Sequence, residues 1–175
     1  DNKMIFNIKT EKLGYEIAIL DLNDDSYNII DINKGENSSY ASLWENSYII
    51  DNEKLYFVAN DGEHGEELFS LDLNTQEVKI LADINKGPLG SYPHLLKSFA
   101  DKIYFIAQDE QYGMEARVLK EDKLELLQEI NPGQASSYPN DIVVLGETIL
   151  IFGQDKDYNQ KIWKIGTILN SLEVK

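Results

Sequence analysis

Three aspartates are the residues of this chain best suited to binding a metal ion. Asp61, Asp109 and Asp155 each follow a short apolar run and begin a polar turn that contains further acidic residues. We assign Glu67 and Glu115 to these acidic turns. Ca²⁺ takes about six to eight oxygen ligands, so each aspartate is a candidate calcium ligand. The alternative is structural: an aspartate here accepts hydrogen bonds from the backbone of its own turn. We favour the structural role and expect no cofactor, with Ca²⁺ as the one ion to test.

The same turns carry side chains suited to ligand contact. Tyr112 and Tyr158 bring rigid amphipathic rings, a side-chain type favoured at binding surfaces. Glu63 and His64 add a charge and a titratable group. We predict these four as ligand-binding residues, although a solvated surface histidine is the alternative for His64.

Nucleophilic or metal-assisted catalysis has little support in this sequence. His64 and His94 are the two histidines, cysteine is absent, and the chain lacks the H-E-x-x-H, G-x-S-x-G, phosphate-loop and dinucleotide motifs. We therefore predict no catalytic residue. A pair of carboxylates cleaving a polymer remains the alternative, because their separation depends on the fold and the chain has 31 acids.

Charge and hydropathy exclude two classes of partner. The net charge of −15 repels nucleic acid phosphates, which require lysine and arginine to displace counterions. The longest apolar stretches, such as residues 142–145, fall far short of the roughly 18 residues that a membrane helix requires. We expect neither nucleic acid binding nor membrane insertion.

The elements that must position these residues are set by an internal repeat. A loop of the type Asp-Ile-Asn-x-Gly occurs at 31–35 and 83–87, with Glu-Ile-Asn-Pro-Gly at 129–133. Each copy is followed by a Ser-Tyr pair, at 39–40, 91–92 and 137–138. The three glycines are 52 and 46 residues apart. A period of this length is typical of arrays of supersecondary units.

Each repeat contains four short strands. Apolar runs at 55–60, 103–108 and 149–154, with a weaker copy at 4–8, are rich in β-branched and aromatic residues and predict buried inner strands. Further strands and tight polar turns follow each run. We predict an all-β fold, a β-propeller-like array of about four antiparallel four-stranded blades in a single domain. The repeat units are 1–35, 36–87, 88–133 and 134–175.

Both ends of the chain fall within a blade. Residues 1–4 resemble 51–55, so we expect the chain to start just before a second strand, without the first. Residues 170–175 resemble 74–79, so we expect it to stop inside a fourth strand. We therefore expect a window of a larger propeller. The alternative is a closed four-bladed ring, in which the C-terminal strand pairs beside residues 4–8.

Strand alternation places the recurring loops on one face. In an antiparallel blade, the loop between blades and the turn that follows the second strand open on the same side. Tyrosines repeated at equivalent positions usually pack one blade against the next. We predict this role for Tyr40, Tyr92 and Tyr138, and a core role for Trp44 and Trp163.

Residues 60–69, Asn-Asp-Gly-Glu-His-Gly-Glu-Glu-Leu-Phe, together with the Asp-Ile-Asn-Lys-Gly loop, resemble the bacterial ELWxxDGT repeat proteins. The resemblance covers nearly the whole chain as four degenerate copies. It departs from the pattern where Glu67-Leu68-Phe69 becomes Glu115-Ala116-Arg117, and where the Asp-Gly-Thr triplet is missing. The resemblance implies a propeller-like, exported or cell-surface bacterial protein without catalytic residues to transfer.

The sequence thus favours a non-enzymatic binding or scaffold module that meets a protein or glycan through one loop face. One alternative is an enzyme acting on an extracellular polysaccharide or peptide, with acidic residues at the propeller funnel. Another is a structural subunit of a larger surface complex, in which a partner chain completes the propeller.

Overall fold

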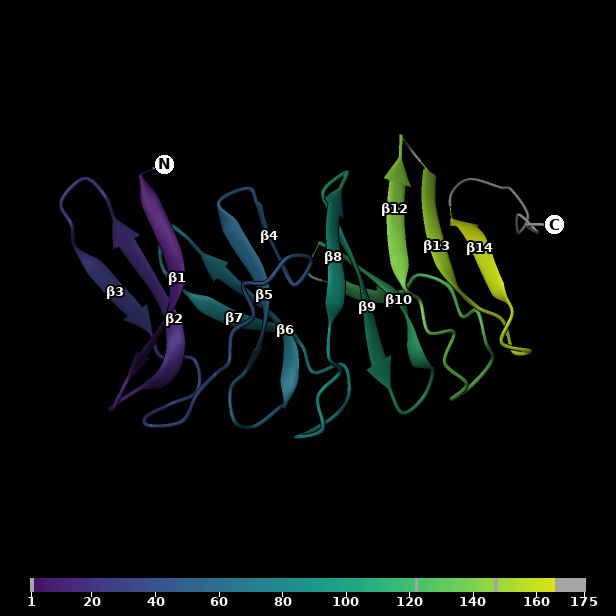
Figure 1. The fold of residues 1–175 in the computed structure, drawn as a ribbon, viewed down its shortest axis with the longest axis horizontal. Helices are drawn as coiled ribbons and strands as arrows, with labels where there is room; N and C mark the ends of the chain where they lie inside the picture. The colour runs from purple at the N-terminus through teal and green to yellow at the C-terminus, as the bar shows by residue number, and fades with distance from the viewer. Residues whose placement is uncertain (1, 122, 147, 166–175) are drawn as a thin grey trace. The chain divides into compact units, whose positions relative to one another are not determined.

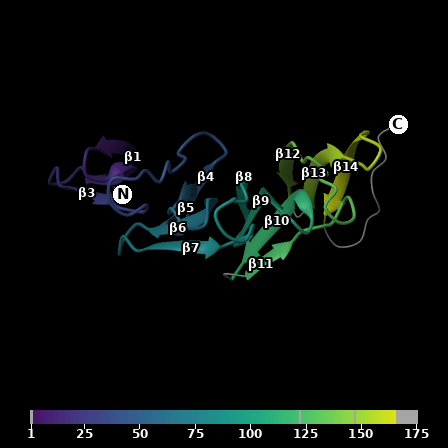
Figure 2. The ribbon, with the colours of Figure 1, turned by 90° about the horizontal axis from the view of Figure 1, so that it is seen from below.

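The computed structural model describes residues 2–121, 123–146 and 148–165 (Figure 1). Within them the chain forms antiparallel strands in four sheets. The chain divides into two compact units, Asp1–Ser91 and Tyr92–Lys175, each of which holds two of the sheets (Figure 2). No helix in the described part of the chain is long and apolar enough to cross a membrane.

The first unit contains a three-stranded and a four-stranded sheet. The three-stranded sheet has the order β1 (Lys3–Thr10), β2 (Gly14–Asp21) and β3 (Tyr27–Ile30). The four-stranded sheet has the order β4 (Tyr48–Asp51), β5 (Lys54–Asn60), β6 (Glu66–Asp72) and β7 (Val78–Ala82). Neighbours in each sheet are also neighbours in the sequence, as in a propeller blade.

The second unit repeats this arrangement. The four-stranded sheet consists of β8 (His94–Phe99), β9 (Lys102–Asp109), β10 (Gly113–Lys120) and β11 (Lys123–Leu126). The three-stranded sheet consists of β12 (Asp141–Leu145), β13 (Thr148–Gln154) and β14 (Gln160–Ile165). The predicted antiparallel blades are therefore confirmed.

Each unit has a hydrophobic core that joins its two sheets. In the first unit, Ile17 and Ile19 of β2 cluster with Phe57 of β5 and Phe69 of β6. The Phe57 and Phe69 rings lie 6.1 Å apart. In the second unit, the core draws on β9 and β10 from one sheet and on β12 and β13 from the other, through Tyr104, Ile106, Val118, Ile142 and Ile149. Apolar burial on this scale supplies most of the driving force that holds adjacent blades together.

The terminal blades match the predicted partial blades as far as they are described. Among the described residues, β1 pairs with β2 alone, and β14 pairs with β13 alone. The expected last strand, residues 170–175, lies outside the described residues. The number of blades in the complete ring stays a prediction.

Candidate functional site

An inner strand of three sheets carries a fully buried glutamate. Glu16 on β2, Glu67 on β6 and Glu115 on β10 are 1%, 0% and 0% exposed. Acidic side chains are almost never buried unless paired or hydrogen-bonded. The partners of these carboxylates therefore decide what the glutamates do.

Each buried carboxylate binds both ends of the loop that leads to the next blade. Glu67 accepts hydrogen bonds from the Asn85 N–H at 3.2 Å and the Ser91 hydroxyl at 2.5 Å. Glu115 does the same with the Asn131 N–H at 3.3 Å and the Ser137 hydroxyl at 2.6 Å. We call each such set a glutamate clamp; the clamps are Glu16 with Asn33 and Ser39, Glu67 with Asn85 and Ser91, and Glu115 with Asn131 and Ser137.

The clamped asparagine closes the loop on itself. Its amide nitrogen donates to a backbone carbonyl five residues later in all three copies: Asn33 to Ser38 at 3.1 Å, Asn85 to Gly90 at 2.8 Å, and Asn131 to Ser136 at 2.9 Å. The acid that begins each loop accepts the N–H of its glycine: Asp31 from Gly35, Asp83 from Gly87, and Glu129 from Gly133. The recurring sequence motif is thus a recurring hydrogen-bond network.

In two of the three clamps, the serine also ties neighbouring blades of one unit together. The Ser39 N–H donates to the Tyr15 carbonyl of β2, and the Ser39 carbonyl accepts the Asn60 N–H of β5 at 2.9 Å. Ser137 makes the equivalent pair of bonds with Met114 of β10 and Gln154 of β13. Because both ends of the loop are fixed, the residues between them are held rigidly on the blade face.

Burial perturbs the titration of the clamps. Desolvation raises the pKa of Glu67 and of Glu115 to about 7, against the hydrogen bonds from Ser91 and Ser137 that favour the charged form. Desolvation also raises the pKa of Glu16. A near-neutral carboxyl pKa often marks a catalytic acid. Here the carboxylates are buried and bonded to loop backbone, so their role is structural.

Sequence reasoning missed these clamps. It grouped Glu67 and Glu115 with the acidic turns, which was wrong, because both are inaccessible to solvent. A signal was present: each buried glutamate stands two residues after a glycine, at Gly14, Gly65 and Gly113. All three glycines have positive φ, a conformation that glycine adopts without steric cost.

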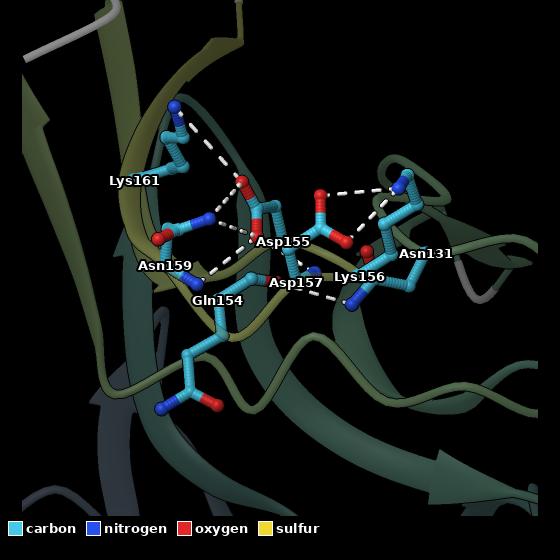
Figure 3. A network of polar contacts seen from close by, with 7 residues as sticks. All are labelled: Asn131, Gln154, Asp155, Lys156, Asp157, Asn159 and Lys161. Atoms are coloured by element: carbon cyan, nitrogen blue, oxygen red, sulfur yellow. Dashed lines mark hydrogen bonds and ion pairs between the residues drawn. The ribbon is translucent and has the colours of Figure 1, made fainter.

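The fourth blade replaces the glutamate with a lysine. Lys161 of β14 stands opposite Gly153 of β13, as Glu115 stands opposite Ala107. Its Nζ lies 3.9 Å from Asp155 Oδ2 (Figure 3). Lys161 therefore forms an ion pair with Asp155 of the neighbouring turn.

The three candidate calcium ligands are bonded to their own turns. Asp61 Oδ1 accepts the N–H groups of Glu63 and His64, at 2.9 and 3.0 Å. Asp109 Oδ1 accepts those of Gln111 and Tyr112, and Asp155 Oδ1 accepts those of Asp157 and Asn159. The structural alternative thus describes all three turns. In the residues that the structure describes, no group of three or more histidines and acids is placed to hold a metal. Ca²⁺ stays the one ion to test at these turns.

The four predicted ligand-binding residues lie on three turns. Glu63 and His64 share one turn of the first unit, where His64 Nδ1 is 2.8 Å from Asp61 Oδ2. The hydrogen bond to Asp61 raises the pKa of His64. In the second unit, Tyr158 is 77% exposed on one turn, and Tyr112 is half-buried on another. Their role in binding stays a prediction.

The repeated tyrosines do not pack between blades as predicted. Tyr40, Tyr92 and Tyr138 are 69%, 47% and 53% exposed, and all three have positive φ. The serine before each tyrosine is fully buried, and the positive φ of the tyrosine leaves its ring in solvent. The prediction that Trp44 lies in the core is also wrong, because its side chain is 80% exposed. Trp163, predicted in the same role, is half-buried.

A polar hollow opens on the loop face of the first unit, with a volume of ≈ 560 Å³. The residues of this amide hollow come from both recurring loop types: Asn33, Glu36, Asn37, Ser38 and Tyr40 from the loop between blades, Asn60, Gly62 and Gly65 from the turn after β5, and Pro88. The prediction that these loops share a face is therefore confirmed in this unit.

The four antiparallel sheets are blades of the β-propeller type, and solved structures agree. TolB from Acinetobacter baumannii matches with a TM-score of 0.56 at 15% identity, over 96% of this chain and 39% of TolB. The β-propeller domain of the trilobed protease from Pyrococcus furiosus matches with a TM-score of 0.58 at 12% identity, over 99% of this chain and 52% of that domain. A prolyl endopeptidase matches with a TM-score of 0.59 at 8% identity, over 93% of this chain and 23% of the enzyme.

These similarities concern the fold. The chain spans about half or less of each of these three structures, and the identities are too low to transfer an activity. No protein-family model matches the sequence, and no curated protein matches it.

Proposed function

We propose that this chain is a non-enzymatic binding module of an exported or surface-displayed bacterial protein, which meets a protein or glycan through its loop face. The observation that carries the proposal is the amide hollow, which is built from two recurring loop types held on a rigid scaffold. Loops fixed by a scaffold are the usual location of binding sites.

The glutamate clamps support binding over catalysis. A catalytic carboxyl must reach its substrate, whereas Glu16, Glu67 and Glu115, all with raised pKa values, are buried beneath the loops that they hold. A clamped loop also loses little conformational freedom when a ligand binds, which lowers the entropic cost of association.

The exported location rests on the resemblance to ELWxxDGT repeat proteins. The recurring Asp-Ile-Asn-x-Gly loop of that resemblance is the loop that the clamps hold. Fractionation of cells carrying the native protein tests this part, and recovery in the cytoplasm would contradict it.

The binding proposal is tested by mapping ligands on the isotope-labelled chain. Amide resonances are followed by NMR while short oligosaccharides and peptides are added. We expect the largest shifts within residues 33–44 and 60–66. Ligands that perturb only strand edges, or cleavage of an added polymer into products, would overturn the proposal.

A further inference from the structure

A second hollow adjoins the amide hollow on the first unit. Its volume is ≈ 330 Å³, and its lining is Asn7, Tyr15, Tyr40, Ala41 and Trp44. We call it the aromatic hollow. Tyr40 lines both hollows, so one exposed ring is shared by an amide-rich surface and an aromatic surface.

We propose that these two hollows form one binding site for a short neutral oligosaccharide, which stacks on Tyr40 and Trp44 and places its hydroxyl groups in the amide hollow. This proposal rests on the proposed binding function and names its ligand class. Both volumes fall in the range of small-molecule sites, about 300 to 1,000 Å³.

The aromatic rings are exposed together. Tyr15, Tyr40 and Trp44 are 45%, 69% and 80% exposed, and the Tyr15 and Tyr40 rings stack at 6.3 Å with an interplanar angle of 28°. Rings left in water at one place are characteristic of an interaction surface. The C–H face of a pyranose is a suitable partner, because it covers a ring without requiring a charge.

The backbone fixes these rings before any ligand arrives. Ser39 is clamped by Glu16, and Tyr40 follows it with a φ of 47°. A bulky residue in this region is strained, and such strain concentrates at ligand sites. Next to it, the Asn7 amide donates to the Ala41 carbonyl at 2.9 Å. The backbone that carries Tyr40 is therefore preorganised.

The amide hollow supplies polar groups in fixed positions. Asn33 uses its amide nitrogen to bond Ser38, which leaves Oδ1 as an acceptor. Asn60 uses Oδ1 to accept the Gly62 N–H at 2.7 Å, which leaves the amide nitrogen as a donor. Asn37 is exposed beside them. Neutral donors and acceptors of this kind match sugar hydroxyls.

The negative charge of the site favours neutral ligands over anionic ones. Among the described residues that line the two hollows there is no lysine or arginine, and Glu36 contributes a carboxylate. One cation borders the aromatic hollow, because the Lys9 ammonium lies 5.1 Å from the centroid of the Tyr15 ring. The chain as a whole carries a net charge of −15. Uronate, sialylated or phosphorylated glycans would be repelled, so a neutral oligosaccharide fits best.

The experiment titrates the purified chain with neutral trisaccharides of glucose, mannose and N-acetylglucosamine, and with trigalacturonate and a tripeptide for comparison. Binding is followed by calorimetry. We expect at least one neutral trisaccharide to bind at millimolar concentration or better. Tyr40→Ala and Trp44→Ala should each weaken binding by about tenfold, as expected for loss of a stacked ring.

The control is Tyr27→Ala, which removes a ring that is 63% exposed on β3 and lines neither hollow; its affinity should match the unmodified chain. Trp44 is so exposed that its replacement should leave the melting temperature unchanged, which separates lost binding from lost folding.

Neutral trisaccharide binding that survives both Tyr40→Ala and Trp44→Ala would overturn this site while leaving the proposed binding function intact. Binding of trigalacturonate or tripeptide alone, or of nothing, would also overturn it, and the NMR mapping then decides the proposed function separately.

Discussion

The Glu67 carboxylate on β6 accepts a 2.5 Å hydrogen bond from the hydroxyl of Ser91, which lies 24 residues further along the chain. Between them lie an outer strand and the whole loop that leads to the next blade. The same relationship recurs between Glu115 and Ser137 at 2.6 Å. The clamp thus converts a polar surface loop into a fixed part of the blade.

Removing a clamp should destabilise the fold strongly. Glu67→Ala leaves the Asn85 N–H and the Ser91 hydroxyl buried without their acceptor, at a cost of about 3 kcal/mol in the free energy of unfolding. Glu67→Gln keeps an acceptor oxygen and should cost about 1 kcal/mol. Urea denaturation at about pH 4, where Glu67 is protonated in the folded chain and its ionisation penalty is absent, measures both.

The matched control is Glu66→Ala, which changes an exposed carboxylate on the same strand and should alter the free energy of unfolding by less than about 0.5 kcal/mol. Equal costs at the two positions would contradict the clamp.

The clamps should make the protein more stable in weak acid. Below pH 4.5 the glutamates are protonated in both states; above that value the unfolded chain ionises first, because burial raises the folded pKa of Glu67 and of Glu115 to about 7. Stability therefore falls as pH rises from 4.5 through 7, by up to about 3 kcal/mol for each glutamate. Melting temperatures measured across this range test the trend.

The double variant Glu67→Gln and Glu115→Gln isolates this effect. His64, whose pKa is raised by Asp61, also stabilises the fold at low pH and loses that effect as pH rises. The carboxyl of Asp72 has its pKa lowered by the N–H groups of Thr75 and Asn74, so it loses its stabilising effect only as pH falls below about 4. A pH slope that persists unchanged in the double variant would assign it to groups other than the clamps.

Replacing a glycine should lower the free energy of unfolding most where another backbone segment lies close to its Cα. Gly65 has a φ of +71°, and a Cβ there would lie 2.5 Å from the Gly90 nitrogen. Gly87 has a φ of +83° with no atom within 4 Å of its Cβ position. Gly87→Ala should therefore cost about 1 kcal/mol from backbone strain alone. Gly65→Ala should cost clearly more in the same denaturation assay, and equal costs would contradict the close approach of the two loops.

The sequence was sufficient to predict the blades, because strand periodicity and the spacing of Gly35, Gly87 and Gly133 are local signals. It was insufficient for the clamps. Acidic residues are normally solvated, and burial of Glu67 depends on Ser91, a contact that only the folded loop creates. The exposed positions of Tyr40 and Trp44 were also missed, because aromatic residues favour the core and the positive φ of Tyr40 is not visible in the residue types.

Arg117 should tolerate an aromatic replacement better than truncation. Its guanidinium is buried and donates to Asp109 Oδ2 at 2.5 Å. Phe69 and Trp163 occupy the equivalent position in two other blades. Arg117→Ala leaves a cavity and an unpaired carboxylate, at about 3 to 5 kcal/mol. Arg117→Phe fills the space and should cost less; a larger cost for phenylalanine than for alanine, by thermal denaturation, would contradict this equivalence.

Calcium should leave the melting temperature unchanged. A calcium ion must replace water with protein oxygens, yet Asp155 Oδ1 already accepts the N–H groups of Asp157 and Asn159, and Lys161 Nζ lies 3.9 Å from Oδ2 (Figure 3). The lysine cation opposes a second positive charge at this turn. Thermal denaturation in calcium chloride and in chelator should therefore coincide. A calcium-dependent rise that Asp61→Asn abolishes would instead assign a metal site to that turn, where the aspartate pairs with His64. Asp109 already pairs with the Arg117 guanidinium at 2.5 Å, so we expect no calcium effect from Asp109→Asn either.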